Sequence, residues 1–164
     1  MGVESLSCER EGDSPGVRLM PPAVFACCLV CGGILEWFFP QNLSFLNHPL
    51  CMGAGVFVGG GGFFFMWAAH EKFKRAGTNV PTHLPATVFV VQGAYRYSRN
   101  PMYLGGVAFF MGLGLAAASP WLITAGLPLI SYLNYYVIPR EEAYMKRAFG
   151  KDYQAYCSET RRWL

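Results

Sequence analysis

Two short stretches hold most of the side chains that could bind a small polar molecule. The first, GAYRYSRNPMYLGG at 93–106, carries two arginines, an asparagine and three tyrosines. The second, PREEAY at 139–144, carries the adjacent acids Glu141 and Glu142. Carboxylates accept hydrogen bonds from hydroxyl and ammonium groups, a guanidinium binds a carboxylate, and tyrosine rings attract a cation. These side chains predict a site for a molecule that combines such groups.

Each stretch also has a simpler interpretation. Arg96 and Arg99 are typical of the polar flank of a membrane span, and Glu141 and Glu142 are typical of the first turn of a helix, where the helix dipole favours negative charge. The residues alone leave both readings open. The elements around the two stretches decide between them.

The composition is that of a chain built for lipid. Hydrophobic residues make up 53% of the 164 residues and charged residues only 14%, whereas soluble domains carry about 25% charged residues. The length predicts one membrane-embedded domain at 19–164. The basic residues are divided among separate segments, so they predict no nucleic-acid binding.

We expect an all-α integral membrane protein with about four transmembrane helices. A helix needs about 20 apolar residues to cross the hydrocarbon core. Four stretches approach that length: 21–39, 50–69, 101 to about 119, and 121–138. Only Ser119 and Pro120 join the last two, which predicts an antiparallel hairpin. The polar residues 1–18 predict a disordered tail.

The placement of positive charge predicts the orientation. Every Lys and Arg lies in the segments 1–18, 70–100 or 139–164. The positive-inside bias places these segments in the cytoplasm, so the expected site faces the cytoplasm. We expect the segment 70–86 to be a loop, TVFVV at 87–91 to be extended, and the segment after Ile138 to form an amphipathic helix broken near Gly150.

Several other features have structural explanations. The cysteines at 27, 28 and 31 lie in an apolar helix without an adjacent acid or histidine, which favours packing. The glycines at 59–62 favour close approach of two helix backbones. Glu36 beside Trp37 favours a place at the membrane interface, and the histidines at 70 and 83 favour solvated positions in the loop. We therefore predict no metal site and assign no catalytic residue.

The two stretches together resemble a known family. GAYRYSRNPMYLG at 93–105, the predicted hairpin, and PREEAYMKRAFGKDYQAY at 139–156 are together similar to the isoprenylcysteine carboxyl methyltransferase family. These integral membrane enzymes use S-adenosylmethionine, and their broader relatives include phospholipid N-methyltransferases. The resemblance covers roughly residues 77–164. It implies that the chain methylates a lipid-borne or lipophilic acceptor, in a bacterial inner membrane or the endoplasmic reticulum.

The resemblance also implies a set of site residues. Arg140 is the candidate for substrate binding. Many family members have His at the position of Asn100, which here can donate and accept hydrogen bonds but cannot carry charge. The cofactor-binding candidates are Thr87, Val88, Phe89, Val90, Tyr95, Asn100, Pro101, Met102, Tyr103, Glu141 and Glu142.

Two other function classes compete with the methyltransferase. Sterol reductases of related fold use NADPH in a comparable cytoplasmic pocket, but such enzymes are much longer. A non-catalytic scaffold assembled through glycine-rich helices would leave both motifs without a purpose. The sequence indicates neither the acceptor nor the oligomeric state.

Overall fold

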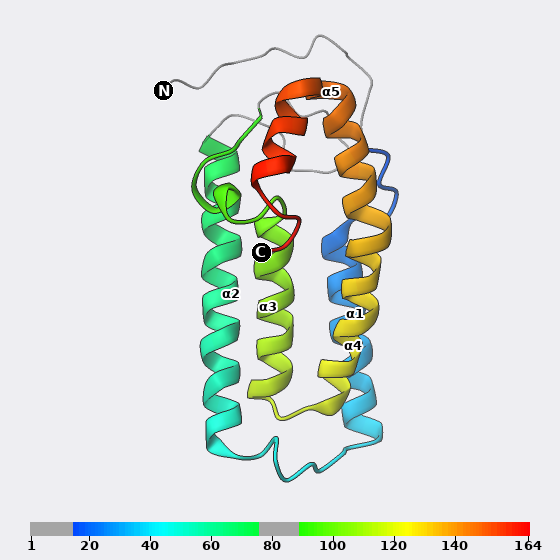
Figure 1. The fold of residues 1–164 in the computed structure, drawn as a ribbon. Coiled ribbons are helices and arrows are strands. Elements are labelled where there is room, and N and C mark those ends of the chain that lie inside the picture. Colours follow the sequence, from blue (N-terminus) through cyan, green and yellow to red (C-terminus); the bar gives the residue numbers. More distant parts are fainter. Residues whose placement is uncertain (1–14, 76–88) are drawn as a thin grey trace.

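The structure is a computed structural model that describes residues 15–75 and 89–164 (Figure 1). Over these residues all regular elements are helical, as the sequence predicted. They are α1 (Pro21–Phe38), α2 (Pro49–Arg75), the short 3₁₀ helix η1 (Gly93–Arg96), α3 (Pro101–Ala116), α4 (Pro120–Tyr132), the π-helical segment η2 (Leu133–Val137) and α5 (Ile138–Glu159).

A proline opens each of the four bundle helices, at Pro21, Pro49, Pro101 and Pro120. The first turn of a helix leaves its N–H groups unpaired, so proline loses nothing there and its fixed φ favours the helix. Each of these prolines is followed by a long apolar run. The helix starts therefore follow directly from the sequence.

Within residues 15–75 and 89–164, three helices are long and apolar enough to cross a membrane: α1, α2 and the continuous helix Pro120–Glu159. The expected third span reached about Ser119, whereas α3 ends at Ala116 and has 16 residues, or about 24 Å at 1.5 Å per residue. It ends early because the turn needs three residues. Ala118 takes a left-handed φ of 49°, and the Ser119 hydroxyl accepts a hydrogen bond from the Leu122 N–H at 3.2 Å.

The helices pack in two pairs. Helix α2 lies against α3, and α1 lies against α4, with the α3–α4 hairpin joining the pairs (Figure 1). Contact between α2 and α3 is close because Gly62 and Gly105 face each other. A Cβ built on Gly105 would lie 2.6 Å from the Gly62 carbonyl oxygen. This is the close backbone approach that small residues allow in membrane helices.

One long helix leads from the bundle to the site. The backbone passes from α4 through η2 into α5, and Pro139 is the second residue after the π segment. Proline has no N–H for the helix ladder and its ring crowds the preceding turn, which favours such a local change. As predicted, α5 is broken at Gly150, with φ 53° and ψ −121°. Its second half turns back over the bundle end (Figure 1).

Both ends of α1 are tied to the bundle. Before α1, Val17 is 3% exposed in the core, and the Leu19 carbonyl accepts a hydrogen bond from the Tyr132 hydroxyl at 2.5 Å. Near the other end, the Glu36 carboxylate accepts a hydrogen bond from the Ser119 hydroxyl. The predicted tail at 1–18 therefore includes one packed residue, Val17. Residues 1–14 lie outside the described residues. The domain limits stay a prediction.

Candidate functional site

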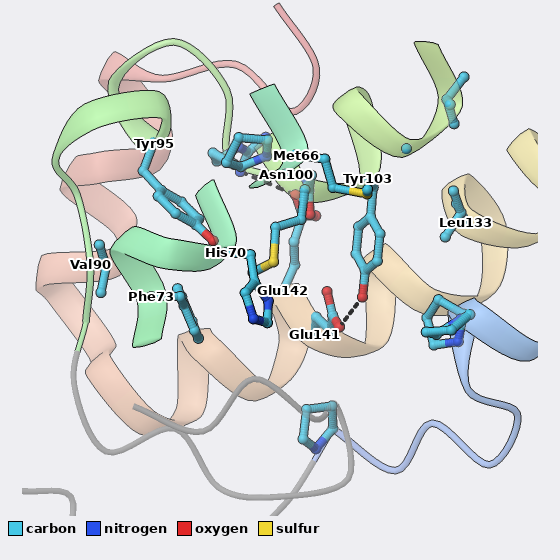
Figure 2. A pocket seen from close by; sticks show the side chains of 18 of the residues that line it. Met66, His70, Phe73, Val90, Tyr95, Asn100, Tyr103, Leu133, Glu141 and Glu142 are labelled. Atoms are coloured by element: carbon cyan, nitrogen blue, oxygen red, sulfur yellow. Dashed lines mark hydrogen bonds and ion pairs between the residues drawn. The ribbon is translucent and has the colours of Figure 1, made fainter. Parts of the chain in front are cut away.

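A cavity of about 830 Å³ opens at the end of the bundle where α2 ends and α3 and α5 begin (Figure 2). Sites for small ligands and cofactors typically measure about 300–1,000 Å³. All five α-helices and η1 contribute side chains to it. The cavity has a polar end near Glu141 and an apolar end deeper between the helices.

A short hydrogen bond joins two of the motif residues at the polar end. The Tyr103 hydroxyl, from the first turn of α3, donates to Glu141 Oε1 at 2.6 Å (Figure 2). A bond from a hydroxyl to a carboxylate is charge-assisted and fixes both side chains. Among the described residues Glu141 has no ion-pair partner. Its carboxyl group is therefore available to a ligand in the cavity.

Glu142, the second acid, is held by two arginines. Arg162 Nε and Nη2 donate to the two carboxylate oxygens at 3.2 and 2.7 Å, and Arg99 Nη1 lies 3.3 Å from Oε1. Burial alone would lower the pKa of Arg99. The Glu142 charge and the contact with Cys157 together outweigh this effect, so the pKa of Arg99 is raised. Glu142 borders the cavity, but its oxygens are already bonded to protein.

The last described residues fold back onto the turn before α3. The Arg162 carbonyl accepts hydrogen bonds from Asn100 Nδ2 at 3.0 Å and from the Ser98 hydroxyl at 3.3 Å. The Arg99 N–H donates to the Arg161 carbonyl at 3.0 Å. Asn100 thus uses its amide nitrogen to hold this segment, and the same residue lines the cavity.

Tyr95 forms a buried wall of the site. It lies on η1, its ring centroid is 5.6 Å from that of Phe73, and its carbonyl accepts a hydrogen bond from the Tyr156 hydroxyl at 2.6 Å. Burial raises the pKa of Tyr95, and the nearby Tyr156 and Glu141 raise it further. The phenol therefore stays protonated and can donate but cannot act as a base.

The apolar end of the cavity lies within the bundle. Phe109 of α3 stacks on Phe25 of α1 and packs on Phe63 of α2, with ring centroids 6.2 and 5.6 Å apart. Trp67 also lines this end and is 52% exposed on the outer surface. Helix α1 packs on α4, and α2 packs on α3. The aromatic end is lined by side chains from both pairs, in the apolar part of the bundle.

Comparison with known proteins assigns the family. Residues 50–152 match the phospholipid methyltransferase family. The chain belongs to this family. The match covers more than half of the chain and includes both the stretch at 93–106 and the acids at 141 and 142.

Two individual proteins are similar to this phospholipid methyltransferase family member. A phosphatidylethanolamine N-methyltransferase of Laccaria bicolor is 28% identical, over 73% of this chain and 14% of its own length. The solved structure of a eukaryotic intramembrane Ras methyltransferase, an isoprenylcysteine carboxyl methyltransferase, has a TM-score of 0.66 at 19% identity. That likeness covers 87% of this chain and 51% of the solved one. The chain thus spans about half, or less, of the length of these relatives.

The structure of this family member brings most of the predicted site residues to one cavity. Thr87 and Val88 lie outside the described residues. Arg140 does not line the cavity: its guanidinium lies 4.0 Å over the Tyr136 ring, on an exposed part of α5. The geometry gives no support to its predicted role in substrate binding. The predicted residues that line the cavity are Phe89, Val90, Tyr95, Asn100, Pro101, Met102, Tyr103, Glu141 and Glu142.

The sequence interpretation missed two site residues. His70 was expected in a loop, but α2 continues to Arg75 and carries His70 into the cavity. The signal was the helical spacing of Met66, His70 and Phe73, which all line the cavity (Figure 2). Arg162 was not considered because its partner Glu142 lies 20 residues earlier, and no periodic pattern connects them.

Proposed function

We propose that this chain is an integral membrane methyltransferase that uses S-adenosylmethionine to methylate a lipid-borne acceptor. One observation carries the proposal: a single cavity joins the polar end at Glu141 and Tyr103 to an aromatic end within the apolar bundle. A water-soluble cofactor and the headgroup of a lipid can meet in such a cavity. The family assignment supports the same activity.

The residues at the polar end suit the cofactor. S-adenosylmethionine supplies an activated methyl group on a sulfonium, and it carries ribose hydroxyls and an amino-acid end. Glu141 offers an unpaired carboxylate to hydroxyl or ammonium groups. The tyrosine rings at 95 and 103 offer faces that attract a cation. Asn100 contributes an amide oxygen. Thr87 and Val88 are assigned to the same site by family resemblance alone.

The protein accelerates this reaction mainly by positioning. The methyl group needs no further activation, so the site has to hold acceptor and methyl group in line and exclude water. The Tyr103–Glu141 bond and the ion pairs of Glu142 fix the walls of the cavity for this purpose. The aromatic end around Phe109 would hold the lipid chain.

We infer that the cavity end of the bundle faces the cytoplasm. Lys72, Lys74, Arg75 and Arg96 lie at this end, whereas the connection at 39–48 and the α3–α4 turn carry no Lys or Arg. The positive-inside bias predicts this orientation. The membrane is then a bacterial inner membrane or the endoplasmic reticulum, with the cofactor taken from the cytoplasm.

Ligand binding tests the proposal. Calorimetry on the purified protein in detergent should show binding of S-adenosylmethionine and none of NADPH. Glu141→Ala should weaken binding about ten- to hundredfold, because a lost hydrogen bond to a charged group costs about 1.5–3 kcal/mol. Glu36→Gln is the matched control, since Glu36 bonds Ser119 at the opposite end of the bundle. Normal binding by a folded Glu141→Ala variant would contradict the site, and binding of NADPH alone would contradict the function.

A further inference from the structure

Among the described residues that line the cavity, His70 is a titratable residue that the proposed function leaves unused. It lies on α2, four residues after Met66 and three before Phe73, so one helix face presents all three side chains to the cavity. Figure 2 shows its ring directed into the space that Glu141 and Tyr103 border. No hydrogen bond or ion pair joins His70 to another residue in the described part of the chain.

The other polar residues of the cavity considered above keep their proton, do not titrate or are already held by other groups. Tyr95 keeps its proton because burial raises its pKa. Arg99 is a cation, and Glu142 is paired with it and with Arg162. Asn100 does not titrate. Glu141 accepts the Tyr103 hydrogen bond and is the carboxylate assigned to the cofactor.

The charges of the cavity favour an acceptor that arrives as a cation. Arg99, the permanent cation among the described lining residues, already faces Glu142. Glu141 has no ion-pair partner in the described part of the chain. An acceptor carboxylate would meet this unpaired negative charge without a free guanidinium to bind it. A protonated amine would be attracted to it.

We propose that His70 is a catalytic residue that takes a proton from the amine of a lipid headgroup. This inference rests on the proposed methyltransferase function. An alkylammonium has no lone pair, so it has to lose one proton before it can react. The imidazole nitrogen of His70 accepts that proton. Imidazole is the side chain best suited to do so near neutral pH.

The transfer then balances without another reactant. The freed lone pair of the amine nitrogen forms a bond to the methyl carbon as the carbon–sulfur bond breaks, and the electron pair of that bond stays on sulfur. The product is a methylated ammonium and a neutral thioether. The imidazolium returns its proton to water at the open end of the cavity, where His70 is exposed.

Methyl transfer to mixed micelles that contain a primary-amine phospholipid tests the proposal. His70→Gln should lower kcat about 10²-fold, within the 10²–10⁴ range of general base catalysis, and leave the affinity for S-adenosylmethionine within about twofold. The wild-type rate should rise with pH as the general base loses its proton. In His70→Gln the rate should instead follow the fraction of the lipid amine that is unprotonated. Added imidazole should restore part of the activity of His70→Ala. Lys74→Gln, on the same helix outside the cavity, should behave as wild type.

The outcomes separate the two proposals. If His70→Gln keeps wild-type kcat and pH profile, His70 is not the base, although the chain is a methyltransferase. If the wild type methylates only a prenylated cysteine carboxylate and no amine lipid, the proposal for His70 is likewise overturned. If the wild type does not bind S-adenosylmethionine, the proposed function fails and the role of His70 with it.

Discussion

Replacing Glu142 by glutamine tests whether its ion pairs hold the two halves of the site together. The carboxylate lies within 3.3 Å of nitrogens from Arg162 and Arg99, which come from different segments of the chain. The Arg99 side chain is 16% exposed, so water can solvate the cation left behind only in part. Removing one partner of a buried pair costs about 3–5 kcal/mol, and the exposed side of Arg162 reduces this to about 2–3 kcal/mol for Glu142→Gln.

Equilibrium unfolding in mixed detergent measures this change in the free energy of unfolding. Arg162→Gln should cost about 1 kcal/mol, since the Arg162 side chain is 35% exposed and Arg99 still faces Glu142. The double variant should cost about 1 kcal/mol less than the sum of the two, because both changes remove the same contact. Lys151→Gln on the exposed face of α5 is the control and should change little.

Additive costs of Glu142→Gln and Arg162→Gln would contradict a stabilising ion pair between these two residues. If the two substitutions cost amounts that simply add, Arg162 does not act on Glu142. The segment 160–164 is then held by its main-chain hydrogen bonds and by Trp163, which donates to Asn134 and packs on the core. A cost under about 0.5 kcal/mol for Glu142→Gln would mean that water solvates the buried arginine freely, as at a surface pair.

Three further predictions concern packing, a family difference and topology. Gly62→Ala should lower the free energy of unfolding by about 1–3 kcal/mol, because its Cβ would lie 2.6 Å from a main-chain nitrogen of α3. Gly61→Ala has open space around it and should be neutral in the same unfolding assay. Asn100→His should keep cofactor affinity within a few-fold by calorimetry, since a histidine N–H can replace the amide donor; loss of binding would show that the amide oxygen is essential. In intact cells, a cysteine at Asn47 should react with an impermeant label and one at Arg96 should not; the reverse pattern would invert the proposed orientation.

The spans could be predicted because lipid imposes a simple rule. An apolar run of sufficient length becomes a helix, and a proline marks where it begins, so the predicted start of the first span at Pro21 agrees with the structure. The last helix was also predictable, because the buried residues Phe149, Tyr153 and Tyr156 recur at helical spacing opposite the exposed Lys146. The turn at Ala118 was not, since nothing in the sequence marks an alanine for a left-handed φ.

The end of α2 shows where hydropathy misleads. The segment HEKFKR at 70–75 is charged, so it read as the loop after a span. The helical spacing of Met66, His70 and Phe73 does continue through it, but the contact that stabilises this last part of the helix is the packing of Phe73 on Tyr95. These two residues lie far apart in the chain, and no local pattern reveals their contact. The same limit applies to Arg162, which reaches Glu142 only after the break at Gly150 has turned the chain back.

The π segment explains why both acids reach the site. Leu129, Leu133 and Val137 are buried at four-residue spacing, and an uninterrupted α-helix would bring position 141 next onto this face. The buried positions instead resume at Ile138 and Glu142, one residue later, directly after η2. A π turn holds one residue more than an α turn, and such turns are frequent at functional sites. The extra residue turns Glu142 inward to the arginines and leaves Glu141 beside it, facing Tyr103 and the cavity. A helix without it would bury Glu141 in the place of Glu142 and remove the unpaired carboxylate on which both the cofactor site and the acceptor charge depend.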